Sequence, residues 1–134
     1  MILGVDPGER RVGLAIADLE TRFARALEVI DARNQDPVAR IAEIVTEAGV
    51  MTVVVGRPLG LSGRPGPAVE AQARLVLALR ERLDVPVEEF DERLTTIVAE
   101  RALRSGGASA AVRRRMRDAI SAQVLLQGYL DRTG

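Results

Sequence analysis

Three acidic residues stand where a carboxylate has little packing reason to be. Asp6 follows the apolar run Ile2–Val5 and precedes Pro7-Gly8, so we expect it at the end of a buried strand. Glu92 lies where an expected strand gives way to an expected helix, and Asp118 heads the apolar stripe of the last expected helix. Three such carboxylates predict a divalent-metal site, and a metal site of this kind predicts phosphoryl chemistry.

Two of these acids also have an ordinary structural explanation. Asp6 begins an Asp-Pro-Gly sequence, which forms turns without any ligand. Glu92 would be stabilised by the dipole of the helix that it precedes. Asp91 is its neighbour on the opposite side of the strand, so only one of the two can point inward. On the residues alone, the choice between Asp91 and Glu92 stays open.

Asp118 makes the strongest physical case for a functional carboxylate. Helical spacing places Ala122, Leu125 and Tyr129 on the same face, which we expect to pack on the sheet. A buried carboxylate is costly without a partner, and an Arg could be that partner. A metal ion shared with Asp6 and Glu92 would satisfy all three acids at once.

Composition limits the ligands that such a site can use. The chain has 134 residues without Cys or His, which excludes disulfides, thiolate metal sites and imidazole bases. Oxygen ligands remain, and they suit Mg²⁺ or Mn²⁺. Acidic residues interrupt the N-terminal apolar run, and no stretch is long enough to span a membrane, so we expect a soluble cytoplasmic protein.

The net charge is zero, with 19 basic and 19 acidic residues, so only the local distribution can favour nucleic acid. Every basic residue is Arg, whose planar fork suits phosphate. Arg10 and Arg11 follow Asp6, and Arg113, Arg114, Arg115 and Arg117 come directly before Asp118. The second cluster could equally be the solvated start of a helix. We predict substrate contacts at Arg10, Arg57, Arg114 and Arg115.

The order of elements predicts an α/β fold in one domain, residues 1–134. The expected strands are Ile2–Val5, Val12–Ala17, Phe23–Ile30, Met51–Val55 and Pro86–Asp91. The expected helices are 37–48, a second with the stripe Val69, Ala73, Val76, Leu79 and Leu83, a third over Leu94–Arg104, and a last over Val112–Leu130. Gly56–Pro67 is either a phosphate-facing loop or an ordinary connection, and 105–109 reads as a flexible break. A five-stranded mixed sheet with helices on both faces follows, with ligands beyond the carboxyl ends of its strands.

Four motifs together resemble the YqgF/RuvX family of ribonuclease H-like nucleases. They are Gly4-x-Asp6-x-Gly8-x-x-Arg11-x-Gly13-Leu14-Ala15, Val53-Val54-Val55-Gly56-Arg57-Pro58-Leu59, Asp91-Glu92-Arg93-Leu94-Thr95-Thr96 and Asp118-x-x-Ser121-Ala122-x-x-Leu125-Leu126-Gln127-x-Tyr129-Leu130. The resemblance covers essentially the whole chain, and it implies a ribonuclease H-like fold.

The resemblance also implies a nuclease that matures the 5′ end of the 16S rRNA precursor. It implies Asp6, Glu92 and Asp118 as catalytic and metal-binding residues, which favours Glu92 over Asp91. Related Holliday junction resolvases carry a second acid three positions along the last helix, where this chain has Ser121. This departure counts against junction resolution, although a branched-DNA endonuclease remains the alternative.

Two hypotheses from other classes compete with a nuclease. The Asp-x-Gly head also opens the phosphate hairpin of actin-like ATPases, but those proteins need two such domains. A non-catalytic RNA- or ribosome-associated factor is the other, and two Phe and one Tyr make a base-stacking platform a poor fit. The sequence leaves open whether the protein is a monomer or a homodimer.

Overall fold

The computed structural model describes residues 1–8, 10–57, 66–91 and 110–133, and for 110–117 and 133 it describes the backbone alone. Its elements are β1 (Ile2–Asp6), β2 (Arg11–Ala17), β3 (Ala24–Asp31), α1 (Pro37–Ala48), β4 (Thr52–Arg57), α2 (Pro67–Arg82), β5 (Val87–Asp91) and α4 (Ala110–Thr133). The five strands and these helices agree with the predicted ranges to within a few residues. The helix predicted over Leu94–Arg104 and the flexible break predicted at 105–109 lie outside the described residues.

The sheet is mixed, as predicted, with the strand order β3-β2-β1-β4-β5. β1, β2 and β3 form an antiparallel meander, whereas β4 pairs in parallel with both β1 and β5. Parallel neighbours need crossover connections, and α1 and α2 lie in those connections. The carboxyl ends of β1, β4 and β5 therefore meet at one edge, which carries Asp6, Arg57 and Asp91 and is called the carboxyl edge below.

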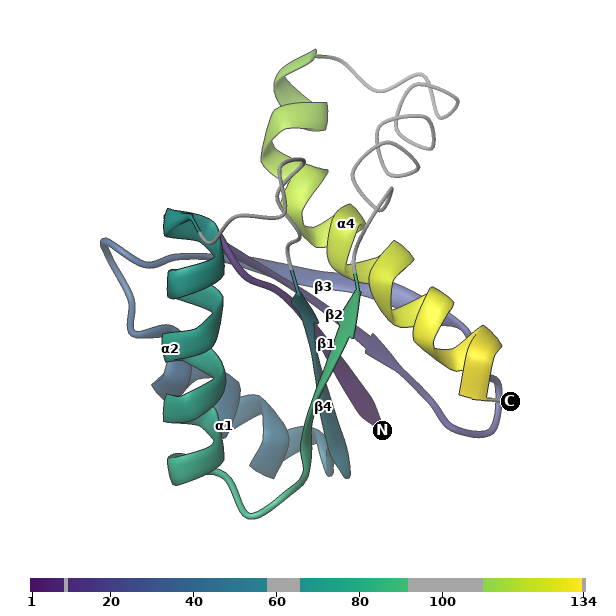
Figure 1. The fold of residues 1–134 in the computed structure, drawn as a ribbon. Helices are drawn as coiled ribbons and strands as arrows, with labels where there is room; N and C mark the ends of the chain where they lie inside the picture. The colour runs from purple at the N-terminus through teal and green to yellow at the C-terminus, as the bar shows by residue number, and fades with distance from the viewer. Residues whose placement is uncertain (9, 58–65, 92–109, 134) are drawn as a thin grey trace.

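Helices cover both faces of the sheet, with α1 and α2 on one side and α4 on the other (Figure 1). The core beneath α1 and α2 contains Leu3, Val5, Val12, Leu14, Ile16, Val53, Val55, Ile41, Ile44, Val76 and Leu79. The start of α1 follows from its cap, because the Asp36 side chain accepts a hydrogen bond from the Val38 N–H at 3.0 Å. These contacts fix the scaffold on which β1 and β4 are held.

A second core lies between the sheet and α4. It contains Ile2, Ala15, Ala17, Ala24, Val54, Ala122, Leu126 and Leu130. The strand residues in this core are mostly small, so the helix packs close to the sheet. A Cβ added at Gly4 would lie 2.8 Å from the Leu126 Cβ. The predicted stripe of this helix is confirmed at Ala122 and Leu125, and Leu126 and Leu130 complete it.

Glutamine side chains tie α4 to the outer strand β3. Gln127 accepts a hydrogen bond from the Ala24 N–H at 2.9 Å and donates one to the Arg22 carbonyl at 3.0 Å. Gln123 donates to the Ala24 carbonyl at 3.1 Å. The Arg22 guanidinium in turn donates to the carbonyl of Leu130. These bonds satisfy backbone groups at the start of an edge strand and hold the helix across the sheet.

Two details of the predicted core were wrong. Met51 precedes β4 and is 62% exposed, because the strand begins at Thr52. In α2 the residue that faces the sheet is Gln72 rather than Ala73, and Gln72 donates to the Glu89 carboxylate at 2.7 Å. The hydrogen bond to Glu89 on β5 compensates for burial of the Gln72 amide. Hydrophobic spacing in the sequence gives no indication of such a partner. Among the helices described, none has the length and hydropathy to cross a membrane.

Candidate nucleic-acid cleavage site

Asp6 is the last residue of β1 and faces the side of the sheet that α4 covers. Strand alternation puts Ile2, Gly4 and Asp6 on one face, and the Cβ direction at Gly4 meets Leu126 and Ala122 of α4. Asp6 is partly buried and pairs with Gly13 across the antiparallel ladder. The carboxylate is therefore held by a rigid central strand and points toward the helix that carries Asp118.

Asp118 lies directly above Gly13. A Cβ built on Gly13 would come within 1.9 Å of the Asp118 carbonyl oxygen and 2.3 Å of its carbonyl carbon. No side chain fits in that space, so the α4 backbone rests on β2 at this point. Because Gly13 is also the ladder partner of Asp6, the fold brings the backbone of Asp118 close to the end of β1 that carries Asp6.

The third predicted acid, Glu92, lies outside the described residues. The strand before it nevertheless bears on whether Asp91 or Glu92 is the third ligand. Glu88 and Phe90 pair with Val54 and Gly56 and face α4, whereas Glu89 contacts Gln72 of α2. Asp91 continues the alternation on the α2 side, away from Asp6 and Asp118. This geometry argues against Asp91 as the third ligand, and Glu92 stays a prediction.

The donor atoms at this edge are carboxylate oxygens, which are the ligands that Mg²⁺ and Mn²⁺ prefer. In the part of the chain that the structure describes, no three acidic, His or Cys side chains gather into a metal-binding group. Two of the predicted ligands, Asp6 and Asp118, belong to the described residues, and the third, Glu92, does not. A hard divalent cation fits this chemistry, and a thiolate- or imidazole-binding metal does not.

The predicted arginines are distributed over both faces of the carboxyl edge. Arg57 ends β4 opposite Asp91 and alternates onto the α2 side, whereas Arg10 is exposed in the turn before β2. Arg11 begins β2 on the α4 face, two positions before Gly13, and is also exposed. It was not among the predicted substrate contacts, although counting by twos from Gly13 would have found it. Arg114 and Arg115 lie on α4, where only the backbone is described.

Ser121 lies one helical turn after Asp118 and is only 2% exposed. Its side chain is therefore enclosed between α4 and the sheet. The buried Ser121 hydroxyl does not take the place of a metal-binding acid at the carboxyl edge. The site thus has one carboxylate on the described part of α4 instead of a pair.

An aromatic contact fastens β5 to α4. The rings of Phe90 and Tyr129 meet edge to face, with centroids 6.0 Å apart and planes at 87°. The Arg132 guanidinium lies 5.3 Å from the centre of the Phe90 ring, and the Tyr129 hydroxyl donates to Glu88. That hydrogen bond, and then burial, raise the pKa of Tyr129 to about 12. The contact holds the strand that leads to Glu92 against the helix that carries Asp118.

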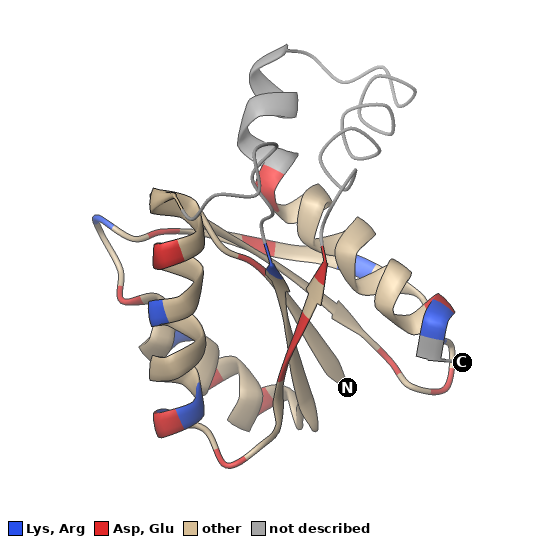
Figure 2. Cartoon of the chain, viewed as in Figure 1, with Lys and Arg blue, Asp and Glu red and all other residues tan. Residues whose placement is uncertain are grey.

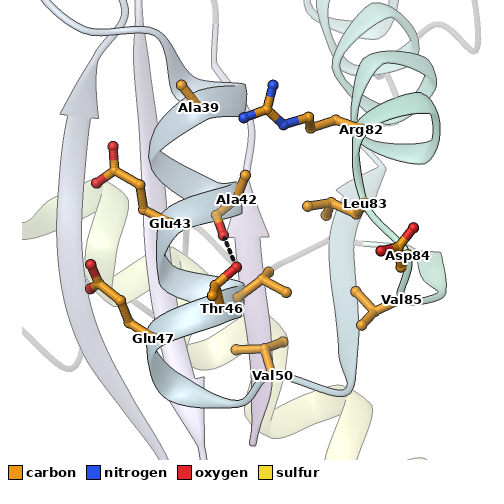
Figure 3. Close-up of a pocket in the computed structure, with 11 residues that line it drawn as sticks. Ala39, Ala42, Glu43, Thr46, Glu47, Val50, Arg82, Leu83, Asp84 and Val85 are labelled. Carbon is orange, nitrogen blue, oxygen red and sulfur yellow. Dashed lines mark hydrogen bonds between the residues drawn. The ribbon is translucent and has the colours of Figure 1, made fainter.

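The described residues also form a groove that is not part of this site. It has a volume of about 630 Å³ and lies between α1 and the end of α2, where Figure 3 shows Arg82 reaching toward Ala39. Val50 and Val85, which precede β4 and β5, are among its lining residues, so it lies toward the opposite edge of the sheet from Asp6. Figure 2 shows acidic and basic residues interspersed over the described elements.

Comparisons with known proteins agree on the class of fold. A family model described as RuvX, Holliday junction resolvase, matches residues 1–132. A candidate pre-16S rRNA nuclease of Chloroflexus aggregans is 47% identical over 131 residues, covering 97% of this chain and 92% of the relative. One from Anaeromyxobacter dehalogenans is 44% identical over 131 residues, covering 97% and 96%.

Solved structures give the same fold. Thermus thermophilus RuvC in complex with a Holliday junction substrate has a TM-score of 0.61 at 22% identity, covering 99% of this chain and 96% of that one. The Fowlpox virus resolvase with Holliday junction DNA has a TM-score of 0.58 at 11% identity, covering 98% and 97%. The predicted ribonuclease H-like, five-stranded fold is confirmed.

Proposed function

Since the chain belongs to the RuvX family, we propose that it is a metal-dependent nuclease that processes the 5′ end of the 16S rRNA precursor in the cytoplasm. Residues 1–134 would form one nuclease domain. The observation that carries the proposal is that Asp6 pairs with Gly13 in the β1–β2 ladder while the backbone of Asp118 lies over the same glycine. The names of the relatives point to the precursor rRNA as the substrate.

The reaction is the hydrolysis of a phosphodiester. A water oxygen forms a bond to phosphorus, one phosphorus–oxygen ester bond breaks, and the departing oxygen takes up a proton. Asp6, Asp118 and Glu92 would hold Mg²⁺ or Mn²⁺. The bound metal would neutralise phosphate charge and lower the pKa of water. The chain has no His, so its carboxylates and the solvent are left to accept the proton of the attacking water.

The substrate backbone would run along the carboxyl edge. Arg11 is on the same face as the two acids and exposed, so its guanidinium is placed to hold a phosphate beside the one that is cut. Arg10 would contact the nucleic-acid substrate from the turn that precedes β2. Arg57, Arg114 and Arg115 would hold more distant phosphates. Charge of both signs elsewhere on the surface favours local contacts over general adhesion to polyanions.

Resolution of Holliday junctions is the second candidate function. It is favoured by the description of the family model and by the fold shared with junction resolvases. Symmetric cutting of a junction needs two copies of the site related by a two-fold axis, and therefore a homodimer. The buried Ser121, in place of a second acid on α4, counts against it.

A cleavage assay in Mg²⁺ and in Mn²⁺ tests both functions. The substrates are 16S rRNA precursor, an unrelated single-stranded RNA and a four-way DNA junction. Asp6→Asn is compared with Asp84→Asn, an exposed acid at the opposite edge of the sheet. We expect precursor cleavage at the 5′ end, reduced at least about 100-fold by Asp6→Asn and unchanged by Asp84→Asn.

Each other outcome of this assay has a definite meaning. Paired cuts in the junction would move the protein to the resolvase function. Equal activity of wild type and Asp6→Asn would remove Asp6 from the site. Precursor binding without cleavage, unaffected by loss of all three acids, would leave a non-catalytic RNA-associated factor.

A further inference from the structure

Two glycines seat α4 on the sheet, but they lie under different parts of the helix. At Gly13 the missing Cβ would meet backbone, the Asp118 carbonyl oxygen at 1.9 Å and the Ala119 nitrogen at 3.0 Å. At Gly4 it would meet the Leu126 Cβ at 2.8 Å and the Ala122 carbonyl oxygen at 3.3 Å. Gly13 therefore supports the part of the helix that carries the acid, and Gly4 supports a part farther from it.

We propose that Gly13 is a positioning residue that sets the distance between the Asp6 and Asp118 carboxylates, and thereby the affinity of the site for a divalent cation. This inference rests on the proposed metal-dependent function and adds to it a residue that touches neither metal nor substrate. Gly13 pairs with Asp6 in the ladder and has the Asp118 backbone above it, so one residue fixes the relative position of both acids.

The clash at Gly13 cannot be relieved by a rotamer change. Side-chain atoms can swing away from an added methyl group, but the Asp118 carbonyl is part of a helix whose hydrogen bonds hold it. Real Cβ contacts essentially never fall below 3.0 Å, whereas the added Cβ would lie 1.9 Å from the Asp118 carbonyl oxygen. Gly13→Ala would therefore push the helix and the strand apart by about 1 Å. A shift of that size at a reactive constellation can cost about 100-fold in activity.

The matched control is Gly4→Ala. It places the same methyl group on the adjacent strand, under the same helix, at a contact that is also too short. We expect both variants to lower Tm by about 3–10 °C, as overpacking of a core does. Only Gly13→Ala should also lower the affinity for Mn²⁺, by about 10- to 100-fold, as loss of a residue that orients metal ligands does.

A second substitution tests the distance between the Asp6 and Asp118 carboxylates directly. Asp118→Glu lengthens the carboxylate arm by one methylene. In the wild-type background the longer arm should weaken Mn²⁺ binding, whereas in the Gly13→Ala background it should restore part of the lost affinity. A merely structural role for Gly13 predicts no such rescue, because a longer acid cannot repair a core. The two changes should therefore be non-additive.

The experiment measures free Mn²⁺ by electron paramagnetic resonance during titration of wild type, Gly4→Ala, Gly13→Ala, Asp118→Glu and the double variant, with Tm recorded without metal. Equal Mn²⁺ affinity of folded Gly13→Ala and Gly4→Ala would overturn the inference alone. If Gly13→Ala does not fold, the Mn²⁺ affinity of Asp118→Glu is the deciding measurement. Affinity equal to or higher than that of the wild type would overturn the inference. A wild-type chain that neither binds Mn²⁺ nor cleaves RNA would overturn the proposed function and this inference with it.

Discussion

Asp6 lies opposite Gly13 in the β1–β2 ladder, and the backbone of Asp118 rests on that glycine. Because Gly13 has no side chain, the backbone of Asp118 in the last helix can approach the strand position that pairs with Asp6. Around this point the small residues of β1 and β2 let α4 approach closely, and Gln123 and Gln127 anchor the helix at β3.

Divalent cations should stabilise the folded protein through Asp6 and Asp118. A metal that binds only the native state at about 100 times its Kd adds about 2.7 kcal/mol to the free energy of unfolding. We expect Mg²⁺ and Mn²⁺ to raise Tm in the wild type, and Asp6→Asn and Asp118→Asn to lose most of that rise. Differential scanning calorimetry measures it, with Asp84→Asn as the control. A full metal-dependent rise in Asp6→Asn would contradict the assignment.

Glu92 and Asp91 should differ sharply in importance despite being neighbours. Alternation along β5 puts Asp91 on the α2 side of the sheet, opposite to Asp6 and Asp118. We expect Glu92→Gln to lower kcat for RNA cleavage by at least about 100-fold, and Asp91→Asn to change it by less than about threefold. Steady-state kinetics at saturating Mg²⁺ separates the two. The reverse ranking would exchange the roles of these two acids.

Arg11 should contribute more to substrate binding than Arg57 does. Arg11 is on the α4 face with the two acids, and Arg57 alternates onto the other face. Losing one phosphate contact reduces the slope of log K against log salt by about 0.7 for a single strand. We expect Arg11→Ala to show this reduction with a raised KM, Arg57→Ala to show less, and exposed Arg74→Ala on α2 to show none. Fluorescence anisotropy across a salt series measures it, and equal slopes for Arg11→Ala and Arg74→Ala would exclude the contact.

Tyr129 should ionise late and couple that ionisation to stability. Its folded pKa is raised to about 12, against about 10 in an unfolded chain. A raised folded pKa means that the neutral phenol is favoured in the native state. Its contribution to stability is therefore complete below pH 10 and is lost as the pH rises from about 10 to about 12. Tyr129→Phe should remove this part of the pH dependence.

The measurement for Tyr129 is unusually clean, because the chain has one Tyr and no Trp. Absorbance of tyrosinate during a pH titration reports this residue alone. The same titration in denaturant supplies the unfolded reference. A native midpoint equal to the denatured one would show that the hydrogen bond to Glu88 does not hold in solution.

The succession of elements could be predicted because its signals are local. Asp36 and Pro37 start α1 by satisfying the first helical N–H groups, and Gly49 ends it in the left-handed conformation with φ 66°. The apolar run Val53–Val55 predicts a strand buried on both faces, and β4 is completely buried there. Such patterns depend on neighbours in sequence and can be read without the fold.

Long-range packing explains the features that sequence patterns did not predict. Gln72 faces the sheet because Glu89 on β5 accepts its hydrogen bond, and a hydrophobic stripe contains no sign of that partner. Arg11 reaches the same face as Asp6 because β2 runs antiparallel to β1 in one particular register. A register is chosen by the pairing of whole strands, so a single segment does not reveal it.

The sequence by itself determined the class of fold and the exclusion of thiolate and imidazole chemistry, and it named the acids predicted to bind a metal, because residue types and local periodicity carry that information. The tertiary structure decided on which face of the sheet each described acid lies. It brought the backbone of Asp118 over Gly13, the ladder partner of Asp6, and turned Asp91 to the other face. Proximity between distant segments depends on strand register and on how closely a helix can approach the sheet, and here a glycine allows the helix to come that close.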